Sequence, residues 1–210
     1  MTGATGQRAG AGVWMAAAFA AALAVALAVL ATAGTAEPGI LLALRLTARV
    51  SFLLFFAAYA GGALAALFGP SFAPLARHGR DFGLAFAAAH LVHLGIVVWL
   101  FRISDNPPIS NLAIVLFTIG AVWLYALTLL SVRSLRARFN PAFVRVFQNR
   151  GLDYIALLFL ADFVVNPLRH GLVHPIGYVP FSLLAVAGPL LRAAAAVRNW
   201  RGVVVSRRAS

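Results

Sequence analysis

Six long apolar runs determine what this chain can fold into. They cover residues 13–33, 46–68, 82–102, 111–132, 152–168 and 179–197. Each run has roughly 17–23 residues, the length at which an α-helix crosses a hydrocarbon core of about 30 Å. Backbone N–H and C=O groups find no water partner in lipid, so such runs must be helical. The sequence therefore predicts an all-α integral membrane protein, a bundle of six transmembrane helices.

The composition agrees with this class and excludes several others. Hydrophobic residues make up 62% of the chain, charged residues make up 10%, and there is no cysteine. The lack of cysteine excludes disulfides, thiolate-ligated haem and iron–sulfur clusters. The net charge of +12 comes from arginine alone. Because the arginines lie in short loops between apolar runs, we expect contact with the lipid bilayer and its anionic headgroups, and no nucleic-acid partner.

The arginines also predict the orientation of the bundle, because cytoplasmic loops of membrane proteins carry an excess of Lys and Arg. With the N-terminus inside, the inner loops and the tail collect most of them: Arg77, Arg80, Arg133, Arg136, Arg138, Arg145, Arg150, Arg198, Arg201, Arg207 and Arg208. The outer side holds Arg45, Arg102 and Arg169, with Arg49 just below the outer surface. We expect both termini to be cytoplasmic, in a multi-pass protein of a bacterial-type inner (plasma) membrane.

The ends of the chain differ from the runs. Residues 1–12 are small and polar, and we expect them to be disordered. Residues 13–200 form the predicted membrane domain, and residues 201–210 form a basic cytoplasmic tail.

The first run has two interpretations. Gly34-Thr35-Ala36, before Glu37, resembles a signal-peptide cleavage site. The run 13–33 is longer than the roughly 7–15 residues of a signal-peptide apolar core. We therefore expect an uncleaved first helix, with cleavage as the alternative.

Two histidines lie near the middle of the third run. An ionisable residue at that depth is costly and is a functional hypothesis by default. His90 and His93 are three residues apart, so they share one helix face about 4.5 Å apart along the axis. Two imidazoles that hold one haem must approach it from opposite sides, so this pair cannot clamp a haem alone. Packing or an interhelical hydrogen bond is the alternative for each ring.

A carboxylate is predicted at the same depth. His93 lies about 16 Å along the third run from Phe82, and Asp162 lies about 16 Å along the fifth run from Gly151. A buried carboxylate needs a partner. We therefore expect a buried polar cluster in which Asp162 pairs with His90 or His93, and Arg49 reaches toward the same site.

Three stretches resemble the ferric reductase-like transmembrane domain family. They are Leu46-Thr47-Ala48-Arg49 at the start of the second run, residues 77–84 (RHGRDFGL) followed by His93, and Tyr154 after an arginine-rich connection. The layout is most similar to the haem-binding membrane subunit of the periplasmic methionine sulfoxide reductase system. The resemblance covers the second to fifth runs.

The resemblance implies a haem site and also a departure from it. In that family a third-helix histidine and two fifth-helix histidines hold b-type haem. His93 stands at the third-helix position, whereas the fifth run has no histidine and carries Asp162 near the place of the outer ligand. The resemblance thus implies at most one haem b, with His93 and His90 as candidate ligands.

Two functions remain open from the sequence. One is a membrane-embedded electron-transfer subunit, as the resemblance implies. It would depend on a separate donor and a redox partner protein, because the chain has no Gly-rich flavin or NAD site after the sixth run. The other is a haem-free member in which His90, His93, Asp162 and Arg49 serve a structural, sensing or proton-linked role.

Two further residue sets have weaker signals. His170 and His174 are spaced as one helical turn, which suits a metal ion, but they lie in a Gly/Pro-bearing loop. Asp153 stands near the start of the fifth run, where a helix N-terminus favours a negative charge.

Overall fold

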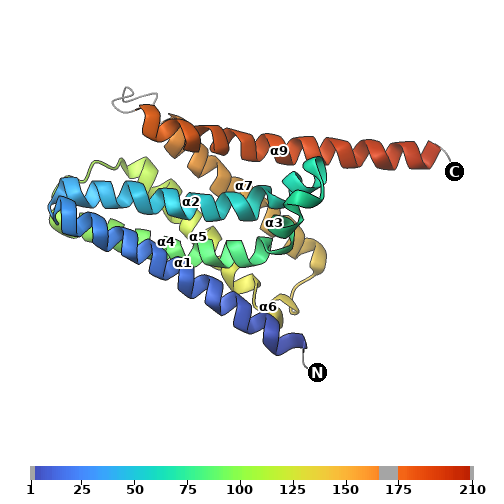
Figure 1. Ribbon diagram of the computed structural model, residues 1–210, viewed down its shortest axis with the longest axis horizontal. Helices are drawn as coiled ribbons and strands as arrows, with labels where there is room; N and C mark the ends of the chain where they lie inside the picture. Colours follow the sequence, from blue (N-terminus) through green and yellow to red (C-terminus); the bar gives the residue numbers. More distant parts are fainter. Residues whose placement is uncertain (1–2, 166–174, 209–210) are drawn as a thin grey trace.

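The computed structural model describes the backbone of residues 3–165 and 175–208, and the side chains of residues 10–165 and 177–200 (Figure 1). Within these ranges every regular element is helical and there is no strand. The elements are α1 (Gly3–Ala33), α2 (Glu37–Phe68), η1 (Pro70–Phe72), α3 (Ala73–Arg77), α4 (Gly79–Ile103), α5 (Asn111–Leu130), α6 (Arg133–Arg136), α7 (Pro141–Leu160), the π-helical turn η2 (Ala161–Val165) and α9 (Pro175–Arg208).

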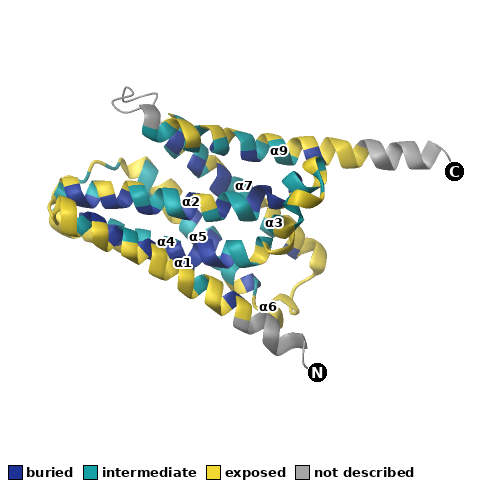
Figure 2. Cartoon of the chain, in the orientation of Figure 1, coloured by how far each residue is buried: buried dark blue, intermediate teal, exposed yellow. Residues whose placement is uncertain are grey.

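Five segments of the described helices are long and apolar enough to cross a membrane. They are Gly10–Ala33, Glu37–Phe68, Gly79–Ile103, Asn111–Leu130 and Gly177–Trp200. Many large apolar side chains on their outer faces are exposed, and Figure 2 shows these faces along the bundle. An apolar exterior of this extent suits lipid rather than water as the neighbour. The helices indicate a multi-pass membrane protein.

The fifth predicted run, residues 152–168, does not form a separate helix in the part that the structure describes. Its described part forms the second half of α7 and the turn η2, whereas residues 166–168 lie outside the described part of the chain. Helix α7 begins much earlier, at Pro141, where the Asn140 side chain accepts a hydrogen bond from the Ala142 N–H at 2.8 Å. It carries three charged side chains, Arg145, Arg150 and Asp153, and is not among the five apolar helices. A sixth crossing stays a prediction.

Other helix ends also differ from the predicted runs. Helix α2 begins at Glu37, so Arg45 and Arg49 lie inside it rather than at its start. Pro38 occupies the first turn, where its missing N–H costs no hydrogen bond. Helix α1 reaches back to Gly3, into the segment expected to be disordered, and α9 continues to Arg208 through most of the predicted tail. In Figure 1 the end of α9 projects beyond the other helices.

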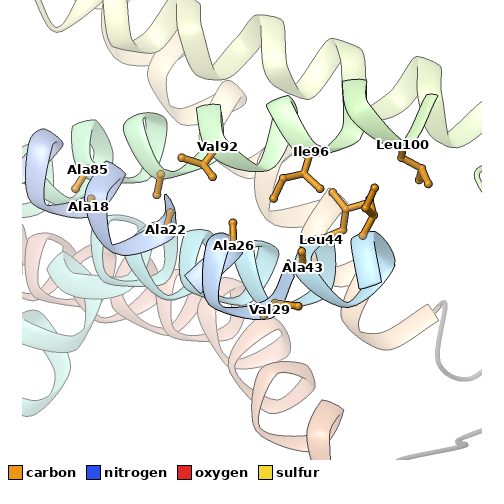
Figure 3. Close-up of a cluster of buried hydrophobic side chains, with 12 residues drawn as sticks. Ala18, Ala22, Ala26, Val29, Ala43, Leu44, Ala85, Val92, Ile96 and Leu100 are labelled. Carbon is orange, nitrogen blue, oxygen red and sulfur yellow. The ribbon is translucent and has the colours of Figure 1, made fainter. Parts of the chain in front are cut away.

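Helices α1, α2 and α4 pack side by side through small residues. Figure 3 shows Ala18, Ala22 and Ala26 of α1 in one buried cluster with Ala85 of α4 and Ala43 of α2. Small side chains let helix backbones approach closely, which gives van der Waals contact where lipid supplies no hydrophobic driving force. The expectation of an uncleaved first helix stays a prediction.

A set of buried phenylalanines joins α2, α4, α7 and the turn η2. We call Phe52, Phe55, Phe86, Phe159 and Phe163 the aromatic layer; all five are buried. Ring centroids lie 5.4 Å apart for Phe55 and Phe86, 5.2 Å for Phe55 and Phe159, and 5.9 Å for Phe86 and Phe159. Such contacts each contribute about 0.5–1.5 kcal/mol beyond area burial. The aromatic layer therefore joins these helices through buried ring contacts.

Helix α5 packs closely against α7 at two glycines. A Cβ atom at Gly151 would lie 2.7 Å from the Trp123 ring, and one at Gly120 would overlap the Leu158 side chain. Tyr154 donates a hydrogen bond to the Leu116 carbonyl at 3.0 Å across the same contact. The close approach of these helices thus depends on the absence of side chains at both glycines.

Candidate functional site

The two mid-helix histidines form a stacked pair on α4. The ring centroids of His90 and His93 lie 5.1 Å apart and the ring planes are 22° from parallel. Phe86 continues the row, with its centroid 5.4 Å from that of His90. The spacing of three to four residues places all three rings on one face of the helix. We call His90 and His93 the imidazole pair.

Thr47 of α2 positions His93. Its Oγ1 lies 3.1 Å from His93 Nδ1, and the residue is fully buried. The same hydroxyl donates its proton to the Ala43 carbonyl at 2.8 Å. We assign the Thr47 oxygen as the acceptor from His93 Nδ1–H, because its one proton has the Ala43 carbonyl as partner. This assignment leaves the lone pair of His93 on Nε2.

The next turn of each helix holds a second pair of polar atoms. Helices α2 and α4 are antiparallel, since Thr47 meets His93 near one end and Ala58 approaches Gly83 near the other. Ser51 follows Thr47 by one turn, as His90 precedes His93 by one turn, so the two lie at the same depth. Ser51 Oγ and His90 Nδ1 are the buried side-chain polar atoms without a hydrogen-bond partner among the described residues.

The predicted polar cluster is brought together in part. The structure joins His90 to His93 and adds Thr47. Asp162 lies in the turn η2 and is half-buried; its pairing with an imidazole stays a prediction. Arg49 is directed to α9, with its Cζ atom 5.3 Å from the ring centroid of Tyr178 and 5.2 Å from that of Phe181.

Among the described residues, the site offers a haem a histidine ligand from one helix only. If a haem bound here, His93 would be the residue to hold it, because Nδ1 contacts Thr47 and Nε2 would remain for the group. Of the other described histidines, His90 stacks on the same side, and His78 caps α4 at its far end beside Asp81, at 3.1 Å. No described histidine faces His93 from another helix. Near His90, the rings of Phe86 on α4 and Phe159 on α7 lie with their centroids 5.9 Å apart.

The prediction of a metal site at His170 and His174 is not tested by the structure. His170 and His174 lie outside the described residues. Among the residues that are described, no group of three or more histidine or carboxylate side chains could hold a metal ion.

Sequence reasoning missed a second set of polar residues. The prediction that Asp153 is a helix N-terminal charge was wrong, because α7 begins at Pro141 and Asp153 lies well inside the helix. Asp153 instead accepts a hydrogen bond from the Tyr59 hydroxyl at 3.0 Å and lies 3.7 Å from Arg192. The signal available in the sequence was the presence of opposite charges inside two apolar runs, at Asp153 and Arg192.

The arrangement around the imidazole pair can hold and move a proton. It offers one lone pair at His93 Nε2, one unpartnered nitrogen at His90, and two hydroxyl groups on α2. Comparison with known proteins adds no assignment: no protein-family model, no curated protein and no solved structure matches this chain.

Proposed function

We propose that this chain is a haem-free, six-span protein of the inner membrane, with both termini in the cytoplasm, whose imidazole pair binds and releases a proton at mid-membrane. The protonation state of the imidazole pair would then affect the hydrogen bonds between α2 and α4. This is the sensing or proton-linked role that the sequence left open.

The observation that supports this role best is the asymmetry of the stacked pair. His93 is bonded through Nδ1 to Thr47, whereas His90 Nδ1 is buried without a partner. A buried polar atom without a partner costs about 1–3 kcal/mol, so it calls for an explanation. If a proton is taken up at His90 Nδ1, that atom becomes a donor and needs an acceptor, and Ser51 Oγ is a buried hydroxyl on α2 that lacks a partner among the described residues.

The pair accommodates one added proton rather than two. Two imidazolium rings with centroids 5.1 Å apart would repel each other strongly in a poorly solvated site. The two rings should therefore titrate as a coupled unit that gains a single proton.

Nitrogen NMR tests this proposal directly. The purified protein is labelled with ¹⁵N-histidine, and the ring signals of His90 and His93 are followed from about pH 9 down to about pH 2, because burial can move an imidazole titration by several units from its ordinary range. We expect uptake of one proton by the pair, with the His93 Nδ1 signal that of a protonated nitrogen throughout. Ser51→Ala should shift the titration and Ser131→Ala should not. Two independent titrations, or none, would contradict the proposal.

One observation favours electron transfer as the second candidate. The bond from His93 Nδ1 to Thr47 is the orienting contact that a haem-ligating histidine commonly has. If haem bound there, His93 Nε2 would hold the iron and the group would supply one-electron chemistry.

A visible absorption spectrum separates the two candidates. Protein purified from cells supplied with haem precursor should be colourless under our proposal. A Soret band that shifts on reduction and disappears in His93→Ala would establish the electron-transfer candidate instead. Fluorescence-detected gel filtration of both forms would show that His93→Ala remains folded.

A further inference from the structure

A second polar site lies where α2, α7 and α9 meet. We call Tyr59, Asp153 and Arg192 the inner triad. The Tyr59 hydroxyl donates to Asp153 Oδ1 at 3.0 Å, and Arg192 Nη2 lies 3.7 Å from the same oxygen. The guanidinium lies over the Tyr59 ring at 4.5 Å and donates to Asn149 Oδ1 at 3.4 Å. One cation and one anion thus stand side by side on different helices.

The charges of the inner triad are not sealed inside the protein. The side chains of Arg192 and Asp153 are 28% and 46% exposed. They open onto a groove of about 390 Å³ between α7 and α9, whose apolar walls include Ala156, Leu157 and Pro189. The contacts within the inner triad leave part of each charged group exposed in this groove, and an exposed charge in a membrane-spanning bundle favours a polar neighbour over hydrocarbon.

The position of the groove along the helices indicates which polar group could lie beside the inner triad. Arg192 lies six residues before Arg198, which donates to the Leu67 carbonyl at the end of α2, so the triad is about 9 Å from that end. Arg150 is exposed and lies about one turn before Asp153 on α7. The groove is therefore within reach of phospholipid headgroups in the leaflet beside the arginine-rich connection.

We propose that this groove binds a zwitterionic phospholipid with a primary ammonium headgroup, phosphatidylethanolamine. The lipid phosphate accepts from Arg192, the ammonium donates to Asp153, and an acyl chain lies along Leu157 and Pro189. An anionic headgroup alone would meet the Asp153 carboxylate. A choline headgroup has no N–H to donate to it. The inference rests on the membrane location of the chain and not on the role of the imidazole pair.

Native mass spectrometry of the full chain tests this inference. The protein is exchanged into micelles containing phosphatidylethanolamine, phosphatidylcholine or phosphatidylglycerol with identical acyl chains, and retained lipid is counted. We expect retention of phosphatidylethanolamine to exceed that of phosphatidylcholine by about tenfold, the value of one charge-assisted hydrogen bond. Asp153→Asn should remove this preference, and Arg192→Gln should lower retention of both lipids.

Two variants keep the result interpretable. Asp153→Glu retains the carboxylate and should retain the preference, which separates the loss of charge from a loss of folding. Arg198→Gln removes an arginine on the same helix outside the groove and should behave as the unmodified chain. Equal retention of phosphatidylethanolamine and phosphatidylcholine would overturn the inference. So would a preference for phosphatidylglycerol, which would indicate a general cationic surface.

Discussion

The contact between Thr47 and His93 leads to the most direct test of the structure. Thr47→Val replaces a hydroxyl by a methyl group of similar size, so the packing of the fully buried side chain is nearly kept. The bond that His93 Nδ1 donates at 3.1 Å is lost, and the N–H is left without an acceptor. Both the stability of the bundle and the tautomer of His93 should respond.

The magnitude follows from the setting of the bond. Interhelical hydrogen bonds in membrane proteins average about 0.6 kcal/mol and reach about 1.7 kcal/mol, because the unfolded chain also finds partners in the membrane. Thr47 is fully buried, so no solvent replaces the lost acceptor. We therefore expect Thr47→Val to lower the free energy of unfolding by about 1.5 kcal/mol, near the upper end of that range.

Thr128 supplies a matched control. Its hydroxyl also donates to the carbonyl four residues earlier, that of Leu124 at 2.9 Å, but it has no imidazole contact among the described residues. Reversible unfolding in mixed micelles measures Thr47→Val, Thr128→Val and the rescuing Thr47→Ser side by side. If the first two lose the same stability, or if the ¹⁵N signals of His93 do not change in Thr47→Val, the assigned role of Thr47 is wrong.

Two other substitutions probe the packing of the bundle. Gly151→Ala brings a methyl group against Trp123 and should lower the free energy of unfolding by about 1–3 kcal/mol. As the control, Gly95→Ala should be neutral or slightly stabilising, because a Cβ atom there meets nothing within 4 Å. Equal unfolding midpoints of the two variants in micelles would contradict the contact between α5 and α7. Arg49→Gln removes the cation–π contacts with two α9 rings and should cost about 0.5–2 kcal/mol, measured by the same unfolding against exposed Arg45→Gln. An Arg49→Gln variant as stable as Arg45→Gln would show that those contacts contribute nothing.

The apolar runs were sufficient to place five of the helices, because a length near 20 residues and an apolar composition leave few alternatives in lipid. Their ends were harder to predict. Helix α2 extends back to Glu37 and includes the apolar residues 40–44 ahead of Arg45. A proline in its first turn, and not a change in hydropathy, marks its start. Helix α7 begins before Arg145 because its N-cap is Asn140, a signal unrelated to hydropathy.

The polar contacts between helices could not be predicted, because hydropathy does not define how each helix is rotated about its axis and therefore which side chains face each other. Depth led to the expectation that Asp162 pairs with an imidazole, which stays a prediction, whereas depth gave no reason to expect the contact between His93 and Thr47 of α2. A threonine in an apolar helix bonds to its own preceding turn and so gives no sign in the sequence that it has an imidazole neighbour. The inner triad was missed for a related reason, because its members lie on three helices and no spacing connects them.

The aromatic layer predicts that the two polar sites act independently. Tyr59 of the inner triad stacks on Phe55 at 5.2 Å, Phe55 contacts Phe86, and Phe86 contacts His90, so the described path between the sites runs through rings without donors or acceptors. A proton cannot pass along such rings, and a charge change on one side is attenuated by distance. Asp153→Asn should therefore leave the ¹⁵N titration of the imidazole pair unchanged while Thr47→Val alters it. A shifted titration in Asp153→Asn would show that the sites are coupled and that the layer does not separate them.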